Sequence, residues 1–168
     1  MIGPGLRLLF VGFNPGLWTA AAGAHFAHPG NRFYPALHAA GITSYRLEVS
    51  SGMALSDRRH LLERGIGITN LVRRATARAD ELEKDELTAG ARRLEANVAE
   101  WKPKVVAVVG IGAYRVAFAE PTTVTGRQSV GAAELFVLGN QSGINAHETV
   151  ATLALSFREV AEAAGLFG

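Results

Sequence analysis

The 168-residue sequence contains no cysteine. This absence excludes disulfide bonds, thiol nucleophiles and iron–sulfur clusters held by cysteine thiolates. No apolar run is long enough to span a bilayer, and the chain start lacks the basic residues and hydrophobic region of a signal peptide. We therefore expect a cytoplasmic protein that does not associate with membranes.

A large excess of one charge is also missing. The chain has 17 Lys and Arg against 15 Asp and Glu, for a formal net charge of +2, which falls short of a strongly basic nucleic-acid-binding protein. Arginine is the commoner cation, and guanidinium groups in loops can bind phosphate. Predicted loops contain Arg32, Arg73, Arg74, Arg78 and Arg127. This pattern is compatible with DNA binding, and a bias in genomic base composition explains it equally well.

Metal and cofactor signatures are absent or incomplete. No spacing of His, Asp and Glu indicates a metal site. Gly110 and Gly112 follow an apolar run and form half of a dinucleotide-binding fingerprint, but Arg115 stands at the third glycine position. We therefore expect no metal and no cofactor, and a dinucleotide-dependent enzyme is a weak alternative.

The remaining pattern is that of one α/β domain spanning residues 1–168. Strand-like and helix-like segments alternate, which predicts a three-layer α/β/α sandwich with a central, mainly parallel sheet. The predicted strands are 6–12, 66–71, 105–110 and an antiparallel pair at 128–130 and 134–138, and the predicted helices are 31–40, 56–64, 84–101, one from 113, and 146–164. The segment 84–101 has an apolar stripe of Leu87, Ala91, Leu94 and Val98 and is interpreted as scaffold.

Two loops at the predicted strand ends carry the chemistry. The first apolar run is followed by Gly12-Phe13-Asn14-Pro15-Gly16. A glycine there would leave the floor of the predicted site open for a substrate. A second loop, Gly139-Asn140-Gln141-Ser142-Gly143-Ile144-Asn145, follows the last predicted strand. Ligands bind beyond the carboxyl ends of parallel strands. The two loops are therefore predicted to be two halves of one site.

Three asparagines lie at these predicted strand ends. They are Asn14, Asn70 and Asn140. An asparagine in a loop often caps its own turn, which is the alternative interpretation for each of them. Three such residues in comparable positions favour a functional cluster.

These motifs resemble those of the mismatch-specific uracil-DNA and thymine-DNA glycosylases. The signature loops of that family read roughly Gly-Ile-Asn-Pro-Gly and Asn-Pro-Ser-Gly-Leu. The likeness continues through residues 26–33, 67–72 and 86–90, in the order of the family. The resemblance implies a monofunctional glycosylase that removes uracil, with G:U mismatches preferred, from double-stranded DNA. We expect it to act as a monomer without a cofactor.

The resemblance also assigns roles within the first loop and around it. Asn14 holds the hydrolytic water, Asn70 reads the uracil edge, and Asn140 supports the departing carbonyl. Gly12, Phe13 and Gly16 shape the base pocket, whose stacking ring is Phe26. Trp18 and Thr19 replace smaller residues of the family and narrow the pocket near the ring carbon that bears the methyl group of thymine. Neither signature loop contains Asp or Glu, so slow turnover is expected.

The second loop is implied to contact DNA. Ile144 matches the apolar wedge that fills the gap left by a flipped base, within a loop formed by Ser142, Gly143 and Asn145. His28 and Arg32 are the nearby phosphate contacts. Gln141 stands where the family commonly has proline, which should leave this loop less rigid. The alternative function is a non-catalytic module that binds nucleotides or damaged DNA on the same fold.

Overall fold

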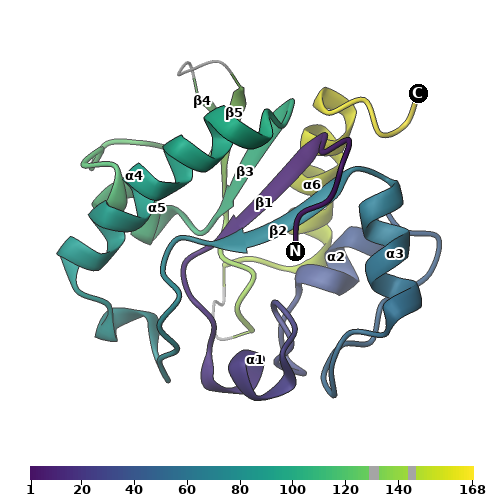
Figure 1. The fold of residues 1–168 in the computed structure, drawn as a ribbon, viewed down its shortest axis with the longest axis horizontal. Helices are drawn as coiled ribbons and strands as arrows, with labels where there is room; N and C mark the ends of the chain where they lie inside the picture. The colour runs from purple at the N-terminus through teal and green to yellow at the C-terminus, as the bar shows by residue number, and fades with distance from the viewer. Residues whose placement is uncertain (129–132, 144–146) are drawn as a thin grey trace.

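A five-stranded sheet forms the centre of the molecule (Figure 1). The computed structural model describes residues 1–128, 133–143 and 147–168. The strands lie in the order β2-β1-β3-β5-β4, with bounds β1 (Leu8–Gly12), β2 (Ile66–Asn70), β3 (Val105–Val109), β4 (Gly126–Gln128) and β5 (Glu134–Leu138). The first three and β5 are parallel, and β4 pairs antiparallel with β5. The mainly parallel sheet agrees with the prediction.

Helices cover both faces of this sheet, as predicted for a three-layer sandwich. They are α1 (Leu17–Ala22), α2 (Phe33–Ala39), α3 (Leu55–Glu63), α4 (Lys84–Trp101), α5 (Ile111–Ala117) and α6 (Val150–Ala163), with a 3₁₀ turn at Ala79–Glu81. Figure 1 shows α4 and α5 on one side and α2, α3 and α6 on the other.

Side chains that alternate along the buried strands fill two hydrophobic cores, one on each face of the sheet. Leu8 and Phe10 of β1 pack with residues of α2, α3 and α6, whereas Leu9 and Val11 pack with residues of α4 and α5. All five residues of β1 are buried, as expected for a parallel strand covered on both faces. Burying each such side chain stabilises the fold by about 1.5–3 kcal/mol relative to exposure.

Three details differ from the predicted elements. Helix α1 was not predicted because it is six residues long and buries none of them, so it has no apolar periodicity. Helix α6 begins at Val150, since the Thr149 side chain accepts the Thr152 N–H and caps the helix there. Strand β4 ends at Gln128, and the remainder of the predicted strand to 130 lies outside the described residues.

The register brings the strand ends to one edge of the sheet. Gly12 pairs with Asn70, and Val109 pairs with Leu138. The loops that follow β1, β2, β3 and β5 therefore leave the sheet on the same side, where ligands bind in open parallel sheets. Helix α1 lies beyond this edge (Figure 1).

Helix α4 packs closely against the chain that follows β2. A Cβ at Gly90 would lie 2.5 Å from the carbonyl oxygen of Leu71, and the Arg93 guanidinium donates to the same carbonyl. Leu71 comes directly after Asn70. The absence of a side chain at Gly90 thus allows α4 to hold the end of β2 in place.

Replacing glycine by alanine inside a helix usually stabilises it. The close packing at Gly90 predicts the opposite effect on stability at this position. Gly90→Ala should destabilise the fold by about 1–3 kcal/mol, because a backbone carbonyl cannot move as a side chain can. The matched control is Gly112→Ala in α5, where a Cβ meets nothing within 4 Å. That change should be neutral or slightly stabilising, by up to about 1 kcal/mol. Urea unfolding of both variants measures the difference, and equal effects would contradict the role of Gly90.

Candidate active site at the carboxyl edge of the sheet

The Asn14 side chain is held by the segment that follows β2. Its Nδ2 donates to the carbonyl oxygen of Arg74 at 2.9 Å and to Oγ1 of Thr76 at 2.8 Å. Thr76 Oγ1 in turn donates to the carbonyl oxygen of Arg78 at 2.6 Å. A carbonyl only accepts, so the Thr76 hydrogen points to Arg78 and its oxygen accepts from Asn14. The direction of every bond in this chain is thereby determined.

This arrangement leaves one group of Asn14 unused. Both Nδ2 hydrogens are engaged, and Oδ1 accepts no hydrogen bond from any residue within 1–128, 133–143 and 147–168. The partners lie 60 and 62 residues away, so Asn14 does not cap its own loop. An amide oxygen is a good acceptor with almost no basicity. Asn14 can therefore orient a water molecule but cannot deprotonate it.

Backbone hydrogen bonds join the loop after β1 to the segment after β2. The N–H groups of Leu71 and Val72 donate to the carbonyls of Gly12 and Phe13 at 2.9 and 2.7 Å. Further along, Gly16 forms a parallel bridge with Thr76, which is only 4% exposed. These backbone bonds set the distance between Asn14 and the groups that bind its amide.

Arg74 anchors the same segment to the start of α4. Its guanidinium donates to both carboxylate oxygens of Glu86, at 2.7 and 2.8 Å, and to the carbonyl of Glu81 at 2.9 Å. The hydrogen bond from Arg74 is the main reason that the pKa of Glu86 is lowered to about 2. Exposed ion pairs add little stability. The pair holds the segment whose Arg74 carbonyl accepts from Asn14.

Gly12 allows two candidate site residues to approach the backbone. A Cβ there would lie 2.7 Å from Asn70 Oδ1 and 3.1 Å from two ring carbons of Phe26. The space expected to be open for a substrate is thus occupied by these side chains, which corrects that expectation. The glycine is required because the Asn70 oxygen and the Phe26 ring converge on it.

Phe26 belongs to the core and is also strained. It is 8% exposed, and its ring stacks on Phe33 with centroids 4.1 Å apart. Its φ of 55° is in the left-handed region, which is rare for a bulky residue and is concentrated at functional sites. Core packing, the alternative to a stacking role, therefore accounts for its burial but not for its backbone conformation.

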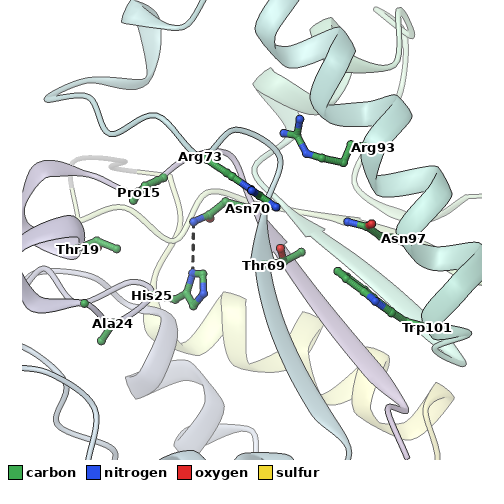
Figure 2. Close-up of a pocket in the computed structure, with 11 residues that line it drawn as sticks. Pro15, Thr19, Ala24, His25, Thr69, Asn70, Arg73, Arg93, Asn97 and Trp101 are labelled. Atoms are coloured by element: carbon green, nitrogen blue, oxygen red, sulfur yellow. Dashed lines mark hydrogen bonds between the residues drawn. The ribbon is translucent and has the colours of Figure 1, made fainter. Parts of the chain in front are cut away.

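Asn70 lines a cavity of about 410 Å³. Figure 2 shows its side chain directed toward His25, with Asn70 Nδ2 3.3 Å from His25 Nδ1. Pro15 and Thr19 line the cavity from the first loop and its helix. The cavity therefore joins the end of β2 to the loop that carries Asn14.

Helix α4 contributes side chains that sequence analysis missed. Arg93, Asn97 and Trp101 line the cavity and point toward it from the helix in Figure 2. The apolar stripe of α4 packs on the sheet as predicted, and the same helix also lines the cavity. The sequence contained a signal for this arrangement. Arg93, Asn97 and Trp101 are spaced four residues apart, and residues at this spacing lie on one face of a helix.

The other predicted pocket residues have local partners. Phe13 packs on Gly110, where a Cβ would lie 2.3 Å from its ring. Thr19 Oγ1 accepts from the N–H of Ala27 at 3.2 Å, and Trp18 Nε1 donates to the carbonyl of Ser50 at 2.9 Å. Trp18 remains 49% exposed. Gly16 is the N-cap of α1, and a Cβ at this position would meet nothing within 4 Å.

The second signature loop contacts the segment before α2. The Arg32 guanidinium donates to the carbonyls of Ser142 and Gly143 at 3.2 and 3.3 Å. A Cβ at Gly143 would lie 2.5 Å from the carbonyl oxygen of Gly30. Arg32 therefore braces this loop, and its predicted contact with phosphate stays a prediction. Ile144, the predicted wedge, and Asn145, a predicted DNA contact, lie outside the described residues.

Asn140 and His28 both form short-range turns. Asn140 Oδ1 accepts the N–H of Ser142 at 2.9 Å, and His28 Nδ1 accepts the N–H of Gly30 at 3.0 Å. Asn140 follows β5, so it shares the edge of the sheet with Asn14 and Asn70. Its oxygen accepts one hydrogen bond in the local turn that an Asx side chain commonly makes, and no described residue accepts from its N–H groups.

The loop arginines separate into paired and unpaired groups. Arg74, Arg78 and Arg127 form ion pairs with Glu86, Asp80 and Glu134. Arg73 lines the cavity and makes no hydrogen bond or ion pair with the described residues. The Arg73 cation is therefore available to a ligand at this edge.

Two kinds of site are not found in the described part of the chain. None of its His, Asp and Glu residues group in threes that could hold a metal ion. None of its helices is both long and apolar enough to cross a membrane.

Comparison with known proteins places these features in a family. The family model of the uracil DNA glycosylase superfamily matches residues 1–163. The solution structure of a proposed uracil DNA glycosylase from Methanosarcina acetivorans has a similar fold, with a TM-score of 0.59 and 17% sequence identity. The similarity covers 95% of this chain and 93% of that one. At this identity the likeness in structure concerns the fold alone.

His25 has the most perturbed histidine environment in the described structure. Burial lowers its pKa from 6.5 to about 4, and the N-terminal ammonium of Met1 acts in the same direction. That ammonium is held near β2 by the carbonyl of Ile68, at 2.8 Å. His25 is therefore neutral at pH 7.

The lowered pKa of His25 predicts an acid-dependent loss of stability. The unfolded chain takes up this proton near pH 6.5, whereas the folded chain takes it up only near pH 4. The free energy of unfolding should therefore fall as pH is lowered between these values, by up to about 1.4 kcal/mol per pH unit from this residue. His25→Leu should reduce that slope. Thermal unfolding from pH 4 to 7 makes the comparison, and parallel curves for parent and His25→Leu would contradict it.

Proposed function

The chain belongs to the uracil DNA glycosylase superfamily, and we propose that it hydrolyses the N-glycosidic bond between uracil and deoxyribose in duplex DNA. The product is an abasic site. The observation that carries the proposal is the Asn14 amide, whose two N–H groups are bound by Arg74 and Thr76 and whose oxygen is left to accept from water. Family membership supports a DNA glycosylase, and the amide supports a mechanism.

The reaction suits an amide that positions water without removing its proton. Uracil is a good leaving group because the electron pair of the broken bond delocalises over its two carbonyls. The sugar then carries oxocarbenium character, and a water held on the correct face adds to it. Asn14 Oδ1 accepts from that water. Backbone N–H groups of loop 12–16 stabilise the charge that develops on the base.

The target nucleotide must leave the DNA stack to reach this site. Phe26 provides the stacking ring, which lies next to Gly12. Asn70 reads the edge of the base, and Asn140 assists the departing carbonyl through its N–H groups. Ile144 fills the position that the flipped base leaves in the DNA duplex. Ser142, Gly143 and Asn145 belong to the same DNA-contacting loop.

Three groups are proposed to contact the DNA backbone. Arg73 is the first, because its guanidinium has no partner among the described residues and lies at the cavity. His28 lies on an exposed turn near Trp18, with ring centroids 5.8 Å apart. Arg32 acts mainly through the loop that it braces. Neutralising phosphates with such cations makes affinity depend on salt.

The preferred substrate is uracil opposite guanine. A mismatched base costs less to unstack than a paired one. Thr19 lines the cavity, and with Trp18 it is proposed to crowd the methyl group that distinguishes thymine. One methyl group is worth only about 1–3 kcal/mol in a hydrophobic pocket. Thymine is therefore disfavoured and not excluded.

The rival function is a module that binds damaged DNA without turnover. It is favoured by the absence of a carboxylate from both signature loops and by the engagement of Asn140 Oδ1 in a local turn. Release of free base separates the two functions, because a binding module leaves the glycosidic bond intact.

The test is a duplex with one G:U mismatch, in excess protein, with free uracil as the readout. The parent should release uracil and leave an abasic site. Asn14→Ala should lower the single-turnover rate by ~100-fold or more and barely change affinity for the duplex, because positioning is lost in the transition state.

The control for this experiment is affinity, measured by fluorescence anisotropy on the same duplex at fixed salt. No release by the parent at any protein concentration would leave the binding module as the answer. Release by Asn14→Ala at the parental rate would refute the role of Asn14 while leaving the glycosylase in place.

A further inference from the structure

We propose that the cavity beside β2 is a nucleotide-binding site, in which Arg73 and Arg93 hold the phosphate and Trp101 stacks on the base. The ligand class is a planar base that carries an anionic phosphate, either as a free nucleoside monophosphate or as part of a DNA strand. Binding at this site goes beyond the proposed function, because it requires no release of uracil.

The part of the cavity next to α4 is bordered by one face of that helix. Arg93, Asn97 and Trp101 point from α4 toward β2, the edge strand of the sheet (Figure 2). Thr69 lines the cavity from β2. Its partner in the strand register, Val11, packs in the core beside α4, so Thr69 lies on the same face of the sheet. The cavity therefore extends along the edge of the sheet beside the helix.

Three polar groups in this part of the cavity have no partner within the described protein. The Arg73 guanidinium, the Asn97 amide and the Trp101 indole N–H form no hydrogen bond with any residue in 1–128, 133–143 and 147–168. The Trp101 ring is partly buried and packs against the core between the sheet and α4, so it is held in place. Polar groups that converge on a cavity in this way are typical of ligand sites.

The charge of the cavity favours an anion. Two of its side chains are guanidinium groups, those of Arg73 and Arg93, and no Asp or Glu is among the described residues that line it. Arg93 donates to the carbonyl of Leu71, which orients its guanidinium and leaves further N–H groups for a ligand. Guanidinium groups bind phosphate through two parallel hydrogen bonds. Phosphate is therefore the anion that this end of the cavity fits.

The other end of the cavity suits a planar base. Trp101 lies about 12 Å beyond Arg93 along the helix axis, a separation comparable to the length of a nucleoside monophosphate. An indole ring can stack on any of the bases, and the Asn97 amide between the two ends offers a donor and an acceptor. A simple anion would leave Trp101 and Asn97 unused. The volume of about 410 Å³ is in the range of small-molecule sites.

The test follows the two indole N–H resonances of the ¹⁵N-labelled protein, one from each tryptophan of the chain. Trp101→Phe assigns them. Trp18 is the internal reference, because its Nε1 donates to the carbonyl of Ser50 and its side chain does not line the cavity. Deoxyadenosine monophosphate is the probe, since adenine is not the base that the proposed reaction releases. It should shift the Trp101 resonance to saturation and leave that of Trp18 unchanged.

Calorimetry with the same probe compares two arginine variants. Arg73→Gln removes a cation without breaking a hydrogen bond to any described residue, and it should raise the Kd by ~10-fold. Arg92→Gln is the matched control, because Arg92 is exposed on α4 and does not line the cavity. It should keep the parental Kd. An unmoved Trp101 resonance, or equal Kd values for the two variants, would overturn the proposal.

Inorganic phosphate and deoxyadenosine test whether both ends of the cavity are used. Each engages only one end, so each should bind at least ~10-fold more weakly than the nucleotide. Phosphate that binds as tightly as the nucleotide would show an anion site only. Deoxyadenosine that does so would show a site for a base only. Either result would contradict a nucleotide site.

A final titration distinguishes the two sources of the nucleotide. The protein is saturated with a duplex that carries non-cleavable 2′-fluoro-deoxyuridine opposite guanine, and deoxyadenosine monophosphate is then added. A duplex that shifts the Trp101 resonance and blocks the probe assigns the cavity to a nucleotide of the DNA strand. Binding of the probe with the parental Kd assigns it to a free nucleotide. If the duplex does not bind, the proposed function fails, and the titrations without DNA still decide whether the cavity binds a nucleotide.

Discussion

The hydrogen bonds that fix the Asn14 amide are the constraint on which the site depends. Water is a poor nucleophile, and an asparagine has almost no basicity with which to activate it. The only help that the side chain can give is to position the water molecule. Placement requires that the amide be held in one orientation, and Arg74 and Thr76 hold it by binding both N–H groups. A free asparagine at a loop tip would sample several rotamers and both amide orientations. The segment that follows β2 is thus as much a part of the site as the signature loop itself.

The rest of the fold keeps that segment in position. Helix α4 approaches the chain closely at Gly90 and Leu71, and its first turn binds Arg74 through Glu86. Parallel pairing of β1 with β2 places Gly12 opposite Asn70, so the amides proposed to position water and to read the base follow neighbouring strands. The second signature loop is held from the other side by Arg32 and by its contact with Gly30. Each half of the site is therefore held in place by residues that lie outside the two signature loops.

The fold was largely predictable from the sequence, because its signals are local. The apolar strands and the stripe on α4 are periodic patterns that burial imposes on the chain, and the three asparagines follow strands whose ends a parallel sheet must bring to one edge. The partners of Asn14 were not predictable, since Thr76 lies 62 residues away in a loop without a recognisable motif. The same holds for His25, whose contact with Asn70 spans 45 residues. Gly12 was predicted to leave space for a substrate, and only the structure shows that the side chains of Asn70 and Phe26 fill the space beside it.

The central claim is that the Asn14 oxygen accepts from water because Thr76 and Arg74 hold its nitrogen. Single-turnover cleavage of a G:U duplex by Thr76→Val and Thr76→Ser tests this claim most directly, with affinity and thermal stability measured alongside. Valine keeps the shape of the side chain without the hydroxyl, so the account predicts a rate at least ~10-fold below the parent with unchanged affinity, whereas serine, which keeps the hydroxyl, cleaves nearly as fast as the parent. A folded Thr76→Val protein that cleaves at the parental rate would contradict it.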